Sequence, residues 1–516
     1  MMNADTRPKR PKAIAVATFL GTFMCILAVS LFGVTLPAIQ SDLGIELSDL
    51  QWVAGTYTLS LSSLMLSAGP IGDRFGHRRT WLTGVGLFVV GSALCGLASA
   101  LPMLIFGKAI QGAGAAFVIP GALSILSHSF PDPVKRARII GGWVAIGNIS
   151  LICGPIIGGY LVDHVGWHGV FWAIIPIGLC ALAFGAFGIP ETANPDKPRL
   201  DVPGQVLSAI FLGALTYAVM TWQQSSLDKP MTLLPAIIAI VALVLFLLVE
   251  LRAANPALPI QLFKKPVFAT SIFASAVVGF TAYPFSIYMS LFMQRVQGWS
   301  ATETGWSLAP IFAATVAVNF LFGALAARIS MRSLLIAGFV LLGAPTVMVG
   351  LMITATSPYL LVLPLFLGFG IGLGLAVPAT DIAVMAAAPD RLAGAASATM
   401  NALRQSGMTI GIALLGIILE MRAVSTLTQS LSAANVVAAP VVAGTAVRLH
   451  EIPDNIAMPE GRFSELLAEA YQHGFMAMFI LSGCCSLAVA LILSMRRSEA
   501  RGPSSEAGSA PAPAAR

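Results

Sequence analysis

Charge is scarce in this sequence: only 10% of its 516 residues are Asp, Glu, Lys or Arg, while 57% are hydrophobic. Soluble globular domains carry roughly 25% charged residues, so this composition excludes a soluble fold. Many apolar runs exceed the roughly 18 residues that mark a membrane-spanning helix. The sequence therefore predicts an all-α protein that crosses a lipid bilayer many times.

Basic residues outnumber acidic ones, 29 to 23, and the formal net charge is +6. In a soluble protein this excess would hint at nucleic acid as a partner. In a membrane protein, Lys and Arg gather instead in the loops that stay in the cytoplasm. We therefore expect membrane lipid, and no nucleic acid, around this chain.

The six cysteines have no metal-ligand spacing, because all of them lie inside apolar runs, and we interpret them as free, buried thiols. They are Cys25, Cys95, Cys153, Cys180, Cys484 and Cys485. A phosphate-binding loop and a nucleophile–base pair are also missing. The sequence thus predicts no metal site, no cofactor and no catalytic residue, which argues against a polytopic membrane enzyme.

Hydropathy divides the chain into fourteen predicted membrane-spanning helices. They lie near 13–39, 50–71, 80–98, 102–128, 138–162, 169–189, 204–223, 231–251, 267–293, 303–326, 333–353, 358–387, 393–419 and 472–495. Most Lys and Arg residues fall in the even-numbered loops and at the two termini. By the positive-inside rule both termini are then cytoplasmic, in a bacterial-type cytoplasmic (inner) membrane.

An internal repeat divides the spans into two sets of six. Gly112, Gly114 and Pro120 recur 258 residues later as Gly370, Gly372 and Pro378. The repeat predicts two six-helix bundles around an inserted pair of helices. The predicted units are a first bundle (1–189), a linker and two-helix hairpin (190–266), a second bundle (267–498) containing a long outside loop (421–471), and a disordered cytoplasmic tail (499–516). Within the outside loop, 453–470 could form a short surface helix.

The loop between the second and third predicted helices, Gly69–Arg79, reads GPIGDRFGHRR. A positive-inside anchor with glycine turns would explain a charged loop of this kind. Its order G-x-I-G-D-R-x-G-x-R-R also resembles the corresponding loop of the major facilitator superfamily. That resemblance implies a cytoplasmic latch formed by Gly69, Asp73, Arg74, Gly76 and Arg78, with Asp73 near the start of the thirteenth helix and paired with Arg78.

Two further motifs support the resemblance. The segment KAIQGAGAA contains Lys108 and Gln111 on one helix face and is similar to the family's fourth-helix motif, in which an Arg stands at the Lys108 position. Lys108 could snorkel to the interface or face the central cavity as an interior cation. In the fifth helix, Gly154, Pro155, Gly158 and Gly159 resemble the GPxxGG motif of exporting antiporters, in particular the fourteen-helix drug:proton antiporters.

The first two helices depart from that branch. Ala28 stands where its members usually have an Asp, and Gly55 stands where some cation exporters have a second acid. The first bundle therefore has no deep carboxylate. We expect better export of neutral, zwitterionic or anionic amphipaths than of quaternary ammonium compounds.

Candidate coupling residues lie instead in the twelfth and thirteenth helices. Asp381 stands about seven residues from the cytoplasmic end of its helix. Asn401, Arg404 and Gln405 lie on neighbouring positions of one side of the next helix, with Arg404 roughly 17 Å deep at about 1.5 Å per residue. An unpaired Arg at that depth would be costly, so it should face the cavity or an acid. Glu420, at the outer end, is interpreted as interfacial.

These features predict a monomeric fourteen-helix transporter of the major facilitator fold. Its expected partners are protons and a small amphipathic drug or metabolite, which it would export by proton antiport and alternating access. A proton-coupled importer is the nearer alternative, and the membrane enzyme is the more distant one.

Overall fold

The computed structural model describes residues 10–191, 202–224, 230–252, 260–389, 392–450 and 458–495, and these form α-helices joined by short turns. The first bundle contains α1 (Pro11–Ser30), α2 (Phe32–Leu43), α3 (Leu47–Phe75), α4 (His77–Gly96), α5 (Leu101–Ser129), α6 (Pro133–Val165) and α7 (Trp167–Gly188). Then follow α8 (Val202–Gln224), α9 (Pro230–Arg252) and the short 3-10 helix η1 (Ile260–Lys264). The rest comprises α10 (Pro266–Arg295), α11 (Ala301–Ala326), α12 (Met331–Met352), α13 (Tyr359–Ala387), α14 (Ala393–Ala433), α15 (Ala439–Leu449) and α16 (Glu460–Met495).

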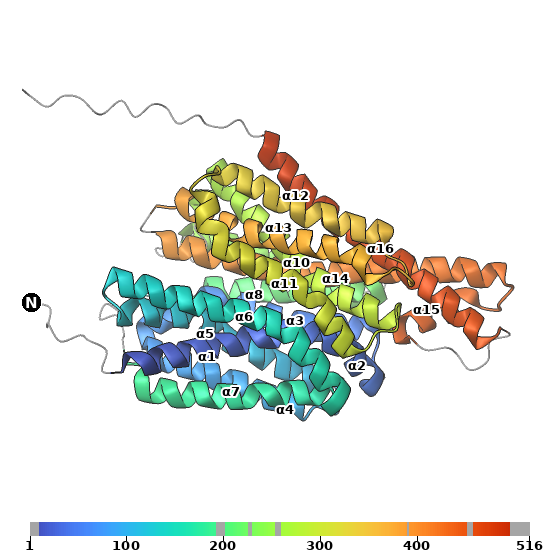
Figure 1. Cartoon of the computed structure of the whole chain (residues 1–516), viewed down its shortest axis with the longest axis horizontal. Coiled ribbons are helices and arrows are strands. Elements are labelled where there is room, and N and C mark those ends of the chain that lie inside the picture. The colour runs from blue at the N-terminus through green and yellow to red at the C-terminus, as the bar shows by residue number, and fades with distance from the viewer. Residues whose placement is uncertain are drawn as a thin grey trace, which may run out of the picture.

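The long helices run side by side along one axis of the molecule (Figure 1). We call the end that carries the turn between α3 and α4 the loop end, and the opposite end the α15 end. The predicted first span consists of two helices, because the helix is interrupted at Leu31, between α1 and α2. The all-α membrane fold predicted from composition is therefore confirmed.

The count of fourteen spans is not confirmed. Twelve helices of the described residues are long and apolar enough to cross a membrane. The predicted spans without a counterpart among them correspond to α3 and α8. Serines and threonines are frequent along α3, which lowers its hydropathy, and the shorter apolar stretch of α8 covers only Val202–Leu215.

The repeated glycines make equivalent contacts in the two halves of the chain. A Cβ on Gly112 would meet the backbone of Tyr57 in α3, and one on Gly370 would meet the backbone of Ile311 in α11. Similarly, Gly114 adjoins α4 and Gly372 adjoins α12. Each glycine pair therefore lets one helix, α5 or α13, pack closely between two neighbours, as small residues do in membranes.

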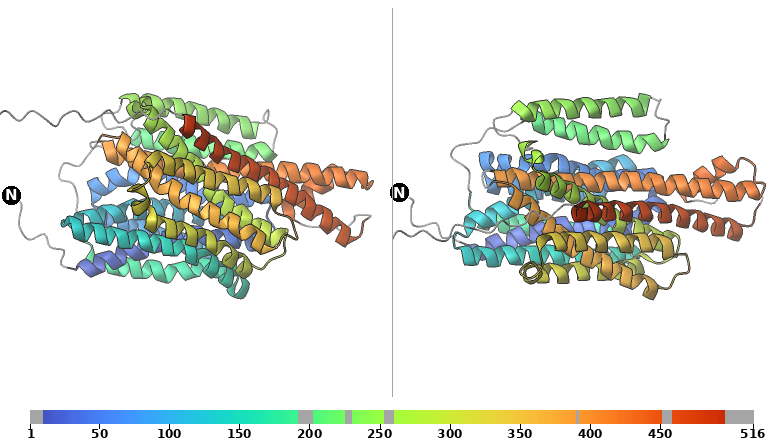
Figure 2. Two further views of the ribbon diagram at one scale, coloured as in Figure 1. Left: turned by 45° about the horizontal axis from the view of Figure 1, so that its top comes forward. Right: turned by 90° about the horizontal axis from the view of Figure 1, so that it is seen from above.

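The α8–α9 hairpin lies along the side of the bundle (Figure 2). Helix α8 packs on α3 and α14, and the ring of Trp52 in α3 lies 5.5 Å from that of Tyr217 in α8. Helix α9 has a broad exposed apolar face that includes Leu234, Ile240 and Leu251. Such a face fits contact with lipid.

The segment predicted as an outside loop, 421–471, is largely helical. Helix α14 has 41 residues and is about 60 Å long, which exceeds the roughly 30 Å hydrocarbon core. It continues to Ala433, and α16 already begins at Glu460, so both helices project past the others at the α15 end (Figures 1 and 2). The short helix of this region is α15 (Ala439–Leu449), whereas 453–470 is divided between α16 and residues outside the described ranges.

Apolar packing between the first and second bundles is concentrated at the α15 end. One buried cluster combines Phe32, Ile39 and Leu50 with residues of α10–α16. A second cluster contains residues of α1 and α3–α7, including Trp81, Phe88 and Leu126. Among the thiols, Cys180 and Cys484 are exposed rather than buried, because their positions lie on outward helix faces.

Candidate functional site

A cavity of about 260 Å³ lies between the two bundles. Its wall is built from α1, α2 and α6 on one side and from α10, α11, α13 and α14 on the other. The polar lining residues, apart from Arg404, are uncharged: Ser30, Asn148, Tyr283, Ser286, Thr315 and Asn319. Most of the remaining lining is aliphatic, so the cavity suits an amphipathic molecule.

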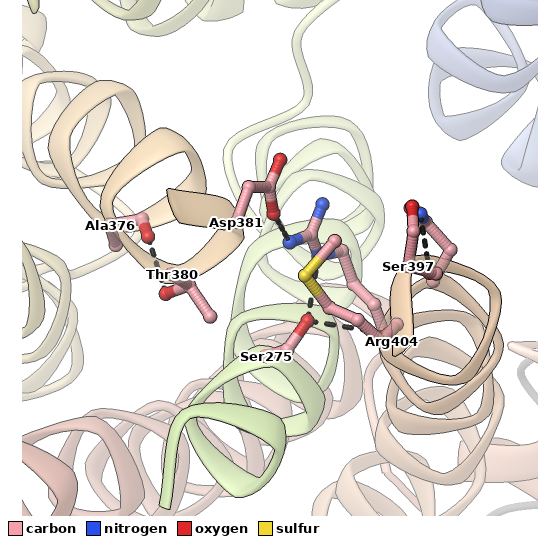
Figure 3. A network of polar contacts seen from close by, with 8 residues as sticks. Ser275, Ala376, Thr380, Asp381, Ser397 and Arg404 are labelled. Carbon is pink, nitrogen blue, oxygen red and sulfur yellow. Dashed lines mark hydrogen bonds and ion pairs between the residues drawn. The ribbon is translucent and has the colours of Figure 1, made fainter. Parts of the chain in front are cut away.

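Arg404 is the charged side chain of this lining, and it is held by two partners (Figure 3). Its Nε donates to Ser275 Oγ of α10 at 3.1 Å, and its Nη2 forms an ion pair with Asp381 of α13. The Arg404 side chain is 13% exposed and that of Asp381 is 40% exposed. The structure thus places the predicted deep arginine at the cavity and beside the predicted acid.

The two other polar residues predicted beside Arg404, Asn401 and Gln405, do not contact it in the hydrogen bonds of the described residues. Asn401 Nδ2 donates to the carbonyl of Ser397 at 3.0 Å. The Oε1 atom of Gln405 is buried and lacks a hydrogen-bond partner among the described residues. Neither side chain is among the described residues that line the cavity.

Two asparagines connect the bundles across the cavity. Asn319 of α11 donates to Asn148 of α6 at 3.4 Å, at the outer limit of a hydrogen bond. The pair was not singled out from the sequence. Each amide still has unused donors and acceptors, so the two could bind the polar groups of a bound molecule.

Lys108 does not face this cavity, which corrects the prediction of a cavity-facing cation. Its Nζ lies 3.7 Å from the ring centre of Phe32, 5.3 Å from that of Tyr57 and 5.5 Å from that of Phe171. The residue is 2% exposed and is absent from the described lining. Aromatic faces attract an ammonium group, and no described carboxylate forms an ion pair with this lysine in the interior of the first bundle.

Gln111 is turned toward α4 in the same bundle. Its Nε2 donates to Ser92 Oγ at 2.8 Å, and the residue is fully buried. The shared helix face of Lys108 and Gln111 therefore packs inside the first bundle. Gly112 lies against α3, and this packing fixes the rotation of α5 that the sequence left undetermined.

The predicted pairing of Asp73 with Arg78 is wrong for this structure. Asp73 contacts His77 Nε2 at 3.2 Å, one helical turn further along the chain. Arg78 Nη2 instead donates to the carbonyl of Ala186, near the end of α7, at 2.7 Å. The reason is geometric: α3 continues to Phe75 and α4 begins at His77, so His77 follows Asp73 at i+4.

Two other residues of this turn, Arg74 and Gly76, have an exposed side chain and an unusual backbone conformation, respectively. Arg74 is exposed, with its guanidinium 5.8 Å from the ring centre of Phe75. Gly76 has φ = +101°, a region that favours glycine. A Cβ at Gly76 would in addition collide with the side chain of Glu191.

The glycines of the GPxxGG motif pack α6 against two neighbours. A Cβ on Gly158 would come within 2.9 Å of Leu31, and one on Gly154 would collide with Ser30. On another face, a Cβ on Gly159 would collide with the backbone of Ala301 in α11. Pro155 lies inside α6 and its carbonyl adjoins Gly305 of α11. The motif therefore lies at a close contact between the two bundles.

Glu420, interpreted from the sequence as interfacial, is covered by other parts of the protein. It is 4% exposed and pairs with Arg448 Nε at 2.8 Å. Arg448 belongs to α15, 28 residues further along the chain. A partner 28 residues away in the sequence leaves no local spacing pattern that would predict the pair, so only the fold reveals it.

A bundle of apolar helices with a cavity between two halves, whose repeated glycines make equivalent contacts, is typical of a polytopic membrane transporter. The sequence profile of the Major Facilitator Superfamily matches residues 18–412. The chain belongs to this superfamily, and it is a transporter rather than an enzyme.

Its relatives include several resistance and export proteins. It is 35% identical over 422 residues to the multidrug resistance protein Stp of Mycobacterium tuberculosis H37Rv, covering 81% of this chain and 78% of that protein. It is 33% identical over 411 residues to the methylenomycin A resistance protein of Bacillus subtilis 168, covering 80% and 88%. It is 30% identical over 514 residues to the tetracenomycin C resistance and export protein of Streptomyces glaucescens, covering 95% and 92%.

Solved structures share the fold at low identity. A POT family transporter in complex with a thioalcohol-conjugated peptide matches with a TM-score of 0.67 and 14% identity, covering 95% of this chain and 98% of that one. A bacterial homologue of the human lysosomal transporter Spinster matches with a TM-score of 0.65 and 16% identity, covering 93% and 96%. These likenesses support the fold of a multi-pass membrane transporter.

Proposed function

We propose that this protein exports amphipathic drugs or metabolites in exchange for protons. The observation that carries the proposal is the Arg404–Asp381 pair at the wall of a mainly apolar cavity between the bundles. The relatives named for resistance and export support the outward direction. Asp381 is the group proposed to take up and release the proton.

The charge of the pair explains how a proton and a substrate could exclude each other. With Asp381 ionised, the pair is neutral overall and Arg404 is held beside Ser275. With Asp381 protonated, Arg404 would carry an uncompensated charge at the cavity, which disfavours an apolar or cationic molecule there. The two ligands would then bind to different states, as antiport requires.

The proposed arrangement in the cell follows from the charged loops. Both termini and the loop end would lie in the cytoplasm of a bacterial-type inner membrane, and the α15 end would face outward. The proposed units are two bundles, 1–189 and 267–498, with residues 190–266 as the inserted hairpin and its linker. A single chain would contain one complete pathway and act as a monomer.

Growth and accumulation measurements test this function. Cells that express the chain should tolerate amphipathic antibiotics better, and accumulate less fluorescent dye, than cells with an empty vector. A protonophore should abolish the difference. Unchanged susceptibility and accumulation across a broad panel, with the protein present in the membrane, would refute export.

A further inference from the structure

Helix α15 is flanked by unusual backbone conformations. Within the described ranges, three residues other than glycine have positive φ: Asn435 (57°), Ala438 (56°) and His450 (58°). Asn435 lies in the turn after α14, Ala438 directly precedes α15 (Ala439–Leu449), and His450 directly follows it. Left-handed conformations cost alanine and histidine energy, so surrounding contacts must hold α15 in place.

An apolar face fixes α15 to the second bundle. Ala443, Ala446 and Val447 are fully buried, and α15 packs chiefly on α14. The carbonyl of Val447 accepts a hydrogen bond from the Tyr471 hydroxyl of α16. Helix α15 therefore forms part of the second bundle rather than a loose connection.

Gln40 of α2 connects the first bundle to this assembly. Its Nε2 donates to the carbonyl of Arg448 at 3.0 Å, and its Oε1 accepts from Arg295 Nη2 of α10 at 2.7 Å. Gln40 is 3% exposed, so both hydrogen bonds are shielded from water. One side chain of the first bundle thus joins α10 and α15 of the second.

The Glu420–Arg448 pair holds the end of α15 that Gln40 contacts. Arg448 donates through Nε to the buried carboxylate of Glu420 in α14, while its backbone carbonyl accepts from Gln40. The Arg448 side chain is 40% exposed, but that of Glu420 is only 5% exposed, so removing Arg448 would leave a buried carboxylate without compensation, which is costly. The position of the Arg448 carbonyl therefore depends on this pair.

Neighbouring contacts join the bundles at the same end. Gln294 Nε2 donates to the carbonyl of Val34 at 3.2 Å. Asp163 of α6 accepts from the backbone nitrogen of Thr302, in the first turn of α11, at 2.8 Å. Side-chain hydrogen bonds between the bundles among the described residues lie at the α15 end or near the middle, so this structure is shut at the α15 end.

His450 is not a protonation switch in this network. Burial, together with the smaller effect of the nearby Arg295 charge, lowers the pKa of His450 to about 3. The ring is therefore neutral at physiological pH and packs 5.2 Å from the ring of Tyr471. Release of α15 must come from separation of the bundles rather than from His450.

We propose that α15 is an outer gate, and that Arg448 and Gln40 are gate residues for transport. In the closed state, the Glu420–Arg448 pair positions the end of α15 as an acceptor for Gln40. Opening toward the outside requires the Gln40–Arg448 and Gln40–Arg295 hydrogen bonds to break. The proposal rests on the transport function and orientation given above.

Cysteine labelling tests the gate. Ser286 lines the cavity, so Ser286→Cys reports whether a membrane-impermeant thiol reagent added outside reaches the cavity. Adding Arg448→Met should raise the labelling rate of Ser286→Cys about tenfold, since a loss of 1.4 kcal/mol in closure shifts the population tenfold. Labelling of the chain without the introduced cysteine gives the background from its native thiols.

The matched control is Arg462→Met, which removes an exposed Arg–Glu pair, with Glu465, in the same region of the chain. It should leave labelling unchanged, because exposed pairs stabilise little. The double variant Glu420→Arg with Arg448→Glu should restore slow labelling. If Arg448→Met does not reach the membrane, Gln40→Leu removes the two hydrogen bonds that Gln40 makes to Arg448 and Arg295 and leaves the Glu420–Arg448 pair in place.

Labelling of Val437→Cys distinguishes an error in the assumed membrane orientation from an error in the proposed gate. Val437 is 88% exposed beside α15, so outside reagent should label it in intact cells. If it is labelled only after the membrane is opened, the orientation is wrong. If it is labelled from outside but Arg448→Met and Gln40→Leu leave the Ser286→Cys rate unchanged, or Arg462→Met raises it equally, the gate is refuted.

Discussion

Arg404 lines the cavity and forms an ion pair with Asp381 of the neighbouring helix. The guanidinium is largely buried, whereas the carboxylate is 40% exposed and open to protons. A change in the charge of Asp381 is therefore felt at the cavity wall through Arg404. This contact makes the pair the strongest candidate for coupling a proton to a substrate.

Neutralising the acid should uncouple transport. In Asp381→Asn the side chain keeps its size but cannot carry a proton, so proton-driven export should fall to background while substrate binding persists. Export is measured as dye efflux from energised vesicles, and binding by fluorescence titration of the purified protein.

Asp381→Glu is the matched control, because it keeps the carboxylate and should retain part of the activity. If Asp381→Asn still pumps against a gradient at the rate of the unchanged protein, another residue carries the proton.

The charge of the cavity should decide which amphipaths are exported. Arg404 is the charged residue of the described lining, whereas its partner Asp381 is not part of that lining, so a bound cation lies nearer to the guanidinium than to the carboxylate that balances it. Without that balance, a unit charge about 6 Å from Arg404 would be repelled by roughly 3 kcal/mol at an effective dielectric near 20, and the ion pair reduces this repulsion. We expect quaternary ammonium dyes to be exported at least tenfold less well than neutral or zwitterionic dyes of the same size. A matched dye panel in vesicles measures this preference.

The substitution that should reverse the preference is Ser286→Asp, which places a carboxylate in the cavity lining. Ala28→Asp, the position suggested by sequence alone, is less suitable because Ala28 is buried and lies outside the described lining. Faster export of dications than of neutral dyes by the unchanged protein would contradict this account of the cavity.

Lys108 should affect stability without setting substrate charge. Its ammonium packs on Phe32, and one such contact contributes about 0.5–2 kcal/mol. Lys108→Met should lower the melting temperature of the purified protein and leave the ratio of zwitterion to cation export unchanged. A large gain in cation export by this variant would mean that Lys108 reaches the cavity during transport.

Asp73 should matter for the conformational cycle rather than for the state described here. It pairs with His77 in this structure, so a contact with α14 would have to form in the outward-facing state. Asp73→Asn should slow transport about tenfold, equivalent to about 1.4 kcal/mol between states, with unchanged membrane levels. Arg79→Met, which breaks the exposed pair with Glu191, is the control and should transport normally.

Hydropathy and repeat spacing were sufficient to predict the helical membrane fold. Gly112 and Gly370 occupy corresponding positions of the repeat and adjoin equivalent helices, because close helix packing depends on small residues at the contact. The span count was less predictable. The polar residues of α3 are acceptable inside a bundle, where other helices cover them, so its hydropathy understates its burial.

Side-chain partners were harder to predict than helices. The rotation of α5 decides whether Lys108 faces the cavity or Phe32, and a sequence fixes that rotation only through packing with other helices. The end of α3 decides whether Asp73 meets His77 or Arg78. Glu420 gained a partner from α15, in a region with no recognisable motif.

Proton-coupled export is tested most directly with the purified protein in liposomes loaded with a pH-sensitive dye. With an acidic interior, and with the cytoplasmic face of the protein on the outside of the liposome, we expect a neutral amphipath to accumulate inside while protons leave, and we expect both movements to stop in Asp381→Asn. Accumulation that is independent of the gradient, or that is accompanied by proton entry with the substrate, would contradict antiport.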